Sequence, residues 1–372
     1  MRLRVLMIIS YFHPFLGGSE QQALHLSAGL IKRGVHVSVL TRSIKGLPRF
    51  EQVMDIPVYR SIRTIQFNKL FGITYILSVF WFLYRKRNSY DIIHCHIAQG
   101  FHSIVALLIK SLFNKKVIIK VAATGPISDF TMIKKVVFGD TFLNKLKNAD
   151  RIITICSQSR QEALGQGIPA SSIIHIPNGV DVDYFKPLSS GEDKENKVIF
   201  IGRLDAMKGV HVLLEAFKQL RDEGLQARLN IIGDGPDRDK YESMARDMDL
   251  NNSVNFSGEI KEVVSFLRKS TMFVLPSLSE GLSNVLLESM ACALPVVATR
   301  VGGNTDLIQD GMNGILVDSG NPGQLSEAMV KILKDKILAK QLGAAARKTV
   351  EKHYSINHII DKYVKLYKQL LS

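Results

Sequence analysis

The stretch TMFVLPSLSEGLSNVLLE, residues 271 to 288, joins a short apolar run to a helical pattern through a turn. The run TMFVLP predicts a buried strand, and LSEGLS predicts the turn. Ser283 is suited to cap a helix that begins near Asn284, which puts Glu280 on the loop and Glu288 in the second helical turn. The free N–H groups of a helix N-terminus would then lie between two carboxylates, beyond the carboxyl end of a strand.

This arrangement suits a ligand with phosphate in its middle and hydroxyl groups at both ends, as in a nucleotide sugar. A strand, loop and helix with two solvated glutamates would explain this stretch equally well. The rest of the chain has to separate the two interpretations.

Short apolar runs alternate with helical patterns in both halves of the chain, which is typical of βαβ units with helices on both faces of a parallel sheet. We therefore expect an α/β protein with two doubly wound, Rossmann-like domains facing each other across a cleft, at residues 1–178 and 179–354. A C-terminal helix at about 355–372 is expected to pack back on the first domain. Turn formers and charges in residues 172–196 mark the connection. The predicted strands are RLRVLMIIS, VHVSVLT, DIIHCHI, KVIIKVAA and RIITICS in the first half, and NKVIFIGRL, ARLNIIGDG, SVNFSG, TMFVLPS, LPVVATR and GILV in the second.

The composition, with 46% hydrophobic and 22% charged residues among 372, is that of an ordinary globular protein. Cys95, Cys156 and Cys292 lie in apolar surroundings without paired spacing, which indicates reduced thiols in a cytoplasmic protein. The apolar run in MRLRVLMIIS is too short for a signal peptide and predicts a first strand instead.

The positive charge is concentrated in the first half of the chain. Residues 1–190 hold 24 Lys+Arg against 10 Asp+Glu, whereas residues 191–372 hold 24 against 24. Basic clusters, among them RKR at 85–87, adjoin the apolar run LFGITYILSVFWFLY at 70–84, which is too short to span a bilayer. Either this run is a helix that contacts an anionic membrane, or a basic face covers an ordinary core helix. No nucleic-acid-binding motif accompanies the charge, so we expect no nucleic-acid partner.

Each half opens with a glycine-bearing turn after its first strand. In the first half Gly17 and Gly18 precede Ser19, which has Gln22 in the capping-box position of a helix that ends at Gly34. Glycines at such a turn let backbone N–H groups approach a phosphate closely.

The corresponding turn of the second half places Gly202, Arg203 and Lys208 between a strand and a helix. Arg203 could bind phosphate oxygens with its forked guanidinium, and Lys208 could act as a point charge.

Taken together, these motifs resemble glycosyltransferase family 4, whose members are retaining enzymes with the two-domain GT-B fold. The resemblance covers nearly the whole chain. It rests on GGSE (17 to 20), PNGVDVDYFKP (177 to 187), GRLDAMKG (202 to 209), IIGDGP (231 to 236), PSLSEGLSNVLLESMACALPVVAT (276 to 299) and GGNTDLIQDGMNGILV (302 to 317).

The resemblance implies a role for each motif residue. Arg203 and Lys208 would stabilise the leaving diphosphate without a metal, Glu280 would contact the transferred sugar and Glu288 would hold the ribose hydroxyls. The backbone N–H groups around Gly281, Leu282 and Ser283 would meet the sugar and diphosphate, with Gly17, Gly18 and Gly202 completing the donor site.

Many relatives in the family carry a histidine near the position of Ala122 or Ala123, and this chain has none there. Asp129 could orient sugar or acceptor, although a helix-capping role is the stronger interpretation. His94 and His96 share one face of a strand, where they could line the acceptor side or simply be packed.

Two further motifs are not expected to be functional sites. DVD at 181–183 resembles a metal-binding carboxylate pair but lies in the connecting segment, so we expect no metal and no cofactor. GDG at 233–235 lacks the third glycine of a dinucleotide fingerprint.

The sequence thus predicts a hexosyltransferase that uses a nucleoside-diphosphate sugar, with UDP favoured, and a glycan or lipid-linked glycan acceptor. Synthesis of a surface polysaccharide such as lipopolysaccharide, at the inner face of the cytoplasmic membrane, would fit such an enzyme. Two alternatives stay open: a sugar-nucleotide epimerase or phosphorylase of the same fold, and a nucleotide-sugar-binding subunit without turnover.

Overall fold

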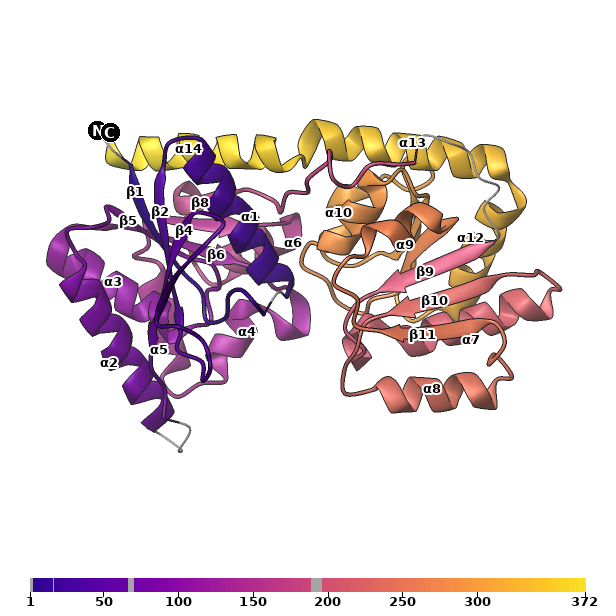
Figure 1. Ribbon diagram of the computed structural model, residues 1–372, viewed down its shortest axis with the longest axis horizontal. Helices are drawn as coiled ribbons and strands as arrows, with labels where there is room; N and C mark the ends of the chain where they lie inside the picture. The colour runs from indigo at the N-terminus through magenta and orange to yellow at the C-terminus, as the bar shows by residue number, and fades with distance from the viewer. Residues whose placement is uncertain (1–2, 16, 66–69, 189–195) are drawn as a thin grey trace. The chain divides into compact units, whose positions relative to one another are not determined.

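The computed structural model describes residues 3–15, 17–65, 70–188 and 196–372. The chain divides into unit 1, formed by Met1–Asn178 with Ile356–Ser372, and unit 2, formed by Gly179–Ser355. Each unit is a sheet with helices on both faces (Figure 1). The helix at the C-terminus therefore belongs to the unit that contains the N-terminus.

Unit 1 has an eight-stranded sheet in the order β3-β4-β2-β1-β5-β6-β7-β8, parallel except for the β3–β4 pair. Its elements are β1 (Arg4–Ile8), α1 (Gly18–Lys32), β2 (His36–Arg42), β3 (Phe50–Val53), β4 (Ile56–Ile62), α2 (Leu70–Arg85), β5 (Ile92–Cys95), α3 (Phe101–Phe113), β6 (Lys116–Val121), the short 3₁₀ helix η1 (Gly125–Ile127), α4 (Asp129–Lys134), α5 (Gly139–Leu146), β7 (Arg151–Thr154), α6 (Ser157–Gly165), η2 (Ala170–Ser172), β8 (Ile173–His175) and α14 (Ile356–Leu371).

Strand β1 shows why this sheet is covered on both faces. Leu6 and Ile8 belong to the core beneath α2 and α3, whereas Val5 and Met7 belong to the core beneath α1 and α14. Side chains alternate between the two faces of a strand, so a run that is apolar at every position needs helices on both sides.

Unit 2 has a parallel six-stranded sheet in the order β11-β10-β9-β12-β13-β14. In Figure 1, α7 and α8 cover one face of this sheet, and α9 and α10 cover the other. Its elements are β9 (Lys197–Ile201), η3 (Ala206–Lys208), α7 (Val210–Asp222), β10 (Arg228–Ile232), α8 (Arg238–Asp247), β11 (Val254–Gly258), α9 (Val264–Lys269), β12 (Met272–Leu275), α10 (Asn284–Ala291), β13 (Val296–Thr299), α11 (Asn304–Leu307), β14 (Ile315–Val317), α12 (Pro322–Lys334) and α13 (Lys336–His353).

Three strands of unit 1 were not predicted: β3, β4 and β8. Strands β3 and β4 form an antiparallel hairpin on the edge of the sheet, in which Gln52 pairs with Pro57. Strand β4 alternates buried and half-buried residues, but Pro57 and Arg60 interrupt its apolar pattern. Arg60 is nonetheless buried, because Glu51 and the carbonyl oxygen of His13 accept its hydrogen bonds.

The start of α1 also differs from the prediction. The N-cap is Gly17, without a side-chain cap, and Ser19 lies inside the first turn. Glycine tolerates the extended N-cap conformation, so the helix gains two residues at its start. The end agrees with the prediction, because Gly34 has a positive φ of 79° and donates its N–H to the carbonyl oxygen of Ile31.

The segment 172–196, expected as a connection, is partly regular structure. Strand β8 pairs with β7 in unit 1, and the division between the units follows it, at Asn178. Residues 189–195 of this segment lie outside the described residues.

The apolar run 70–84 lies in helix α2. One side of this helix is buried, and the buried side chains are Tyr75, Val79, Phe82 and Leu83. Within the described ranges, no helix is both long and apolar enough to cross a bilayer. Cys95, Cys156 and Cys292 are buried, and none of the three forms a disulfide bond.

Candidate functional site

The loops of unit 2 that follow β9, β12 and β13 carry most of the residues singled out in the sequence. Helix α10 begins at Asn284, and the Ser283 hydroxyl accepts a hydrogen bond from the Leu286 N–H at 3.3 Å, as the capping pattern predicted. Glu280 lies on the loop before this helix and Glu288 lies within it. Parallel strands end at the same edge of a sheet, so the three loops gather at one place.

Glu280 is nearly buried and paired with Lys208. The lysine Nζ lies 2.5 Å from Glu280 Oε1, which also accepts a hydrogen bond from the Ser277 hydroxyl at 2.9 Å. Glu280 is 8% exposed, and Ser277 is completely buried. The pair joins the loop after β12 to η3, so it holds a cation and a carboxylate at one position.

Glu288 has a different environment. It is half-buried, and its carboxylate accepts no hydrogen bond from any residue that the structure describes. Burial raises the pKa of Glu288 from 4.5 to about 7. A half-buried carboxyl group without a donor is suited to accept hydrogen bonds from the hydroxyl groups of a ligand.

Arg203 is an exposed charge at this edge. Its side chain is 71% exposed, and its Nε lies 3.5 Å from Asp205 Oδ2. Exposed pairs at that separation contribute little to stability, so the guanidinium can leave Asp205 for a ligand at low cost.

Glycines allow the loops of this edge to approach each other. The Gly303 N–H donates to the Gly281 carbonyl oxygen at 2.6 Å, and a Cβ at Gly303 would lie 2.2 Å from that oxygen. A Cβ at Gly209 would lie 2.1 Å from the Pro276 carbonyl oxygen, and one at Gly233 would lie 1.9 Å from that of Gly202.

Sequence reasoning gave no role to Gly209, Gly233, Gly303 or Ser277. The repeated pairing of glycine with a strand end was the available signal for the glycines, but GDG was considered only as a family motif and as an incomplete dinucleotide fingerprint. Nothing in the local sequence marked Ser277 as a partner of Glu280, because three residues of a loop can take many conformations.

Unit 1 holds the other predicted residues. Gly17 is the N-cap of α1, and a Cβ there would lie 2.6 Å from the Glu20 carboxylate. Gly18 is the first residue of the helix. The two glycines thus lie at the N-terminus of the helix that follows β1.

His94 and His96 are buried, at 0% and 1% exposure, so the packed interpretation describes them and an acceptor-lining position does not. Their rings stack with centroids 4.4 Å apart, and His94 Nδ1 lies 2.7 Å from the Tyr367 hydroxyl of α14. Burial lowers the pKa of His94 to about 3, so the ring is neutral at ordinary pH. Sequence alone did not reveal that α14 covers this face.

Asp129 is buried and connects two strand-end loops. Its Oδ1 accepts the N–H groups of Ala98 and Gln99, and its Oδ2 accepts those of Ala122 and Ala123 at 2.8 and 3.0 Å. The cap of α4 is Ser128, so Asp129 is not the predicted capping residue. The backbone at Ala122 and Ala123 is therefore held by this aspartate.

The carboxylates at 181–183 act on the local backbone. Asp181 Oδ1 accepts the N–H groups of Asp183 and Tyr184, each at 3.0 Å. Within the described part of the chain, no cluster of three or more potential metal-ligating side chains occurs.

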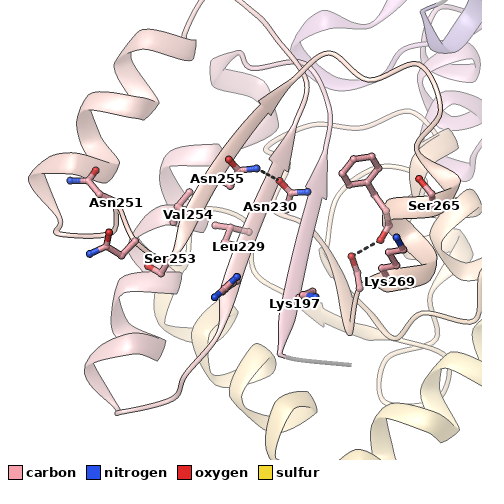
Figure 2. Close-up of a pocket in the computed structure, with 13 residues that line it drawn as sticks. Lys197, Leu229, Asn230, Asn251, Ser253, Val254, Asn255, Ser265 and Lys269 are labelled. Atoms are coloured by element: carbon pink, nitrogen blue, oxygen red, sulfur yellow. Dashed lines mark hydrogen bonds between the residues drawn. The ribbon is translucent and has the colours of Figure 1, made fainter. Parts of the chain in front are cut away.

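Figure 2 shows a pocket of ≈ 600 Å³ elsewhere on unit 2, formed by β10, β11 and α9. Lys197 and Arg228 in its lining are the first residues of β9 and β10, so it lies toward the amino ends of these strands. An Asn255 to Asn230 hydrogen bond of 3.0 Å crosses its wall. The pocket is therefore separate from the edge that carries Lys208 and Glu280.

Comparison with known proteins gives matches over nearly the whole chain. The family model described as Glycosyltransferase Family 4 matches residues 16–184, and the one described as Glycosyl transferases group 1 matches residues 185–349. An uncharacterized glycosyltransferase of Methanocaldococcus jannaschii is 29% identical over 99% of each chain. The N-acetyl-alpha-D-glucosaminyl L-malate synthase of Bacillus anthracis is 27% identical over 96% of each chain.

Among solved structures, Anabaena HepE in complex with UDP and glucose superimposes with a TM-score of 0.82 at 18% identity, covering 99% of this chain and 100% of HepE. This likeness concerns the fold. The two adjoining family matches agree with the division of the chain into two Rossmann-like units. They also agree with the loops around Lys208 and Glu280. The chain therefore belongs to the group 1 glycosyl transferases, with a family 4 N-terminal part, and is a glycosyltransferase of the GT-B fold.

Proposed function

We propose that the protein is a retaining hexosyltransferase that takes its sugar from a nucleoside diphosphate, with UDP favoured, and transfers it to a glycan or lipid-linked glycan. HepE, which was crystallised with UDP and glucose, supports the choice of UDP. The B. anthracis relative is named for an N-acetylglucosaminyl product, which supports a hexose-type sugar.

The observation that carries the proposal is the placement of Glu280 and Glu288 on the two sides of the N-terminus of α10. The N–H groups of Gly281, Leu282 and Ser283 lie between the carboxylates in sequence, and helix N-termini bind phosphate. Glu288 would hold the ribose hydroxyls and Glu280 would contact the transferred sugar.

In the proposed reaction, the bond between the anomeric carbon and the diphosphate oxygen breaks, and the acceptor oxygen bonds to the same face of that carbon. The acceptor proton passes to the departing phosphate oxygen, so no side-chain base is required. Arg203 and Lys208 are the cations that would stabilise the growing charge, with Gly202 at the turn that places Arg203.

Gly17 and Gly18 would contribute N–H groups to the donor. Asp129 would act by fixing the loops at Ala98 and Ala122, on the side where the acceptor binds, rather than by touching a substrate. With a lipid-linked acceptor, the protein would work at the inner face of the cytoplasmic membrane in synthesis of a surface polysaccharide.

The proposal is tested by thermal unfolding of the purified protein with UDP-, GDP- and ADP-sugars. A ligand present at about 100 times its dissociation constant adds about 2.7 kcal/mol to the free energy of unfolding. We expect stabilisation by UDP-sugars, and its loss in the Glu288→Gln variant. Stabilisation by none of the three classes would contradict the donor assignment.

The anomeric configuration of the product, measured by NMR, tests retention and separates transfer from the two alternatives. An epimerase would change the sugar without an acceptor, and a binding subunit would be stabilised without turnover.

A further inference from the structure

The outer side of helices α2 and α3 in unit 1 is an unusual surface for a helix pair. The exposed side chains of α2 include Leu70, Ile73, Leu77, Trp81 and Tyr84, with Leu77 61% and Trp81 56% exposed. Their spacing of three or four residues puts them on one face, about 21 Å long. Helix surfaces that face water normally carry charged residues, whereas none of these five residues is charged.

Helix α3 extends the same surface. It runs beside α2 in Figure 1, and its exposed side chains include Leu108 and Leu112, which are one helical turn apart. The rings of Tyr84 and Phe113 meet with centroids 5.8 Å apart, so the two helices are in contact near their ends. We define the apolar face as Leu70, Ile73, Leu77, Trp81, Tyr84, Leu108 and Leu112. An exposed apolar area of this kind marks an interaction site.

Basic side chains adjoin the apolar face. The Arg85 guanidinium lies over the Trp81 ring at 5.9 Å, and that of Arg87 lies over the Tyr84 ring at 4.7 Å. From residue 56 to residue 128 the sequence has ten lysines and arginines but a single acidic residue, Asp91, which pairs with Arg4. The surroundings of this face therefore attract anions.

We propose that the apolar face is a membrane-docking surface that lies flat on a bilayer containing anionic lipid. Aliphatic side chains would enter the acyl region, Trp81 and Tyr84 would lie at the headgroup level, and Arg85 and Arg87 would meet lipid phosphates. Two copies of this face would bring only basic groups together, which disfavours a dimer. Docking at this surface would bring the protein to a lipid-linked acceptor. The biological purpose of the docking surface therefore rests on the proposed function.

The full-length protein provides its own reporter, because Trp81 is the only tryptophan in the sequence. The probes are vesicles of phosphatidylcholine with and without phosphatidylglycerol, at low and high salt. We expect cosedimentation with the anionic vesicles at low salt, release as salt rises, and a blue shift of Trp81 emission on binding. The vesicle experiment contains no donor and no acceptor, so it tests membrane docking separately from sugar transfer. A negative result would leave the transferase assignment unchanged, and a failed transferase assignment would leave a positive docking result unchanged.

Two matched pairs of variants locate the contact. The double variant Ile73→Ser and Leu77→Ser should bind anionic vesicles at least about tenfold more weakly, whereas Ile337→Ser, at an exposed residue of unit 2, should bind as the wild type does. Arg85→Gln should weaken binding at low salt, whereas Lys240→Gln, which removes a cation over the Tyr241 ring of unit 2, should not. Thermal unfolding of each variant shows that it is folded.

Three results would overturn the proposal. The first is vesicle binding without a change in Trp81 emission, and the second is no binding to anionic vesicles at low salt. The third is a dimer, seen by sedimentation without lipid, that dissociates in the Ile73→Ser and Leu77→Ser variant. That result would assign the apolar face to contact between copies of the chain.

Discussion

The ammonium group of Lys208 lies 2.5 Å from a carboxylate oxygen of Glu280, so the cation proposed to stabilise the diphosphate is paired with the carboxylate proposed to contact the sugar. The two side chains come from loops that follow different strands, 72 residues apart. Without ligand, each of the two charges neutralises the other. Donor binding would bring phosphate to one member and hydroxyl groups to the other.

This pairing predicts how Glu280→Gln behaves. The variant should bind nucleoside diphosphate at least as well as the wild type, because Lys208 keeps its charge and loses its internal partner. It should have a lower catalytic constant, since the contact to the transferred sugar is weakened. Calorimetry with UDP and initial rates with the intact donor measure the two quantities.

Lys208→Ala and Arg203→Ala are the contrasting variants, because they remove stabilisation that grows as the phosphate departs. They should lower the catalytic constant most. A Glu280→Gln variant with strongly weakened UDP binding would show that Glu280 serves the nucleotide half of the donor.

Glu288 predicts a dependence on pH. Its pKa is raised by burial from 4.5 to about 7 in the folded protein, so the folded state holds a proton that the unfolded state releases. The corresponding stability is present below about pH 4.5 and is lost as the pH rises through about 7. As the pH rises across that window, the free energy of unfolding of the wild type should therefore fall relative to that of Glu288→Gln.

Donor affinity should change in the opposite sense, because ribose hydroxyls bind an ionised carboxylate more strongly. Binding of intact UDP-glucose, whose diphosphate does not titrate near neutrality, should tighten as the pH rises through about 7. Glu288→Gln should remove this trend and cost about 1.5 to 3 kcal/mol at high pH. Glu280→Gln is the control and should keep the pH trend. If Glu288→Gln kept the trend as well, the assignment of Glu288 to the ribose hydroxyls would be wrong.

Metal independence follows from the cations Arg203 and Lys208 and from the local role of Asp181. Activity should survive EDTA. Asp181→Asn should be mild because the amide oxygen can still accept the N–H groups of Asp183 and Tyr184. Recovery on adding manganese of activity that EDTA had removed would show that the reaction needs a metal.

Gly303→Ala should disturb the loop that holds Glu280, because the new Cβ would lie 2.2 Å from the Gly281 carbonyl oxygen. Overpacking of this kind costs about 1 to 3 kcal/mol in the free energy of unfolding. Gly165→Ala at the end of α6 is the control: its Cβ would meet nothing within 4 Å, so stability should change by less than about 1 kcal/mol. Denaturant unfolding measures the stability of both variants. Equal effects would mean that the loop at Gly303 can move to accommodate the new Cβ.

Local sequence patterns were sufficient to predict the two α/β sheets and the capped start of α10. Apolar runs, glycine turns and a serine cap act over a few residues, so the pattern and the structure have the same physical cause. The pattern failed at β4, where Pro57 and Arg60 interrupt the apolar run and the pairing with β2 stabilises the strand instead.

The tertiary structure alone decided which side chains meet. Lys208 reaches Glu280, Tyr367 of α14 covers His94, and Asp129 holds the backbone of Ala122, across separations of 72, 273 and 7 residues. Packing also decided that α2 buries Tyr75 while exposing Trp81, although both lie in the same apolar run. Periodicity shows that a helix has faces, but only the neighbouring elements determine which face is covered, because burial depends on contacts between distant parts of the chain.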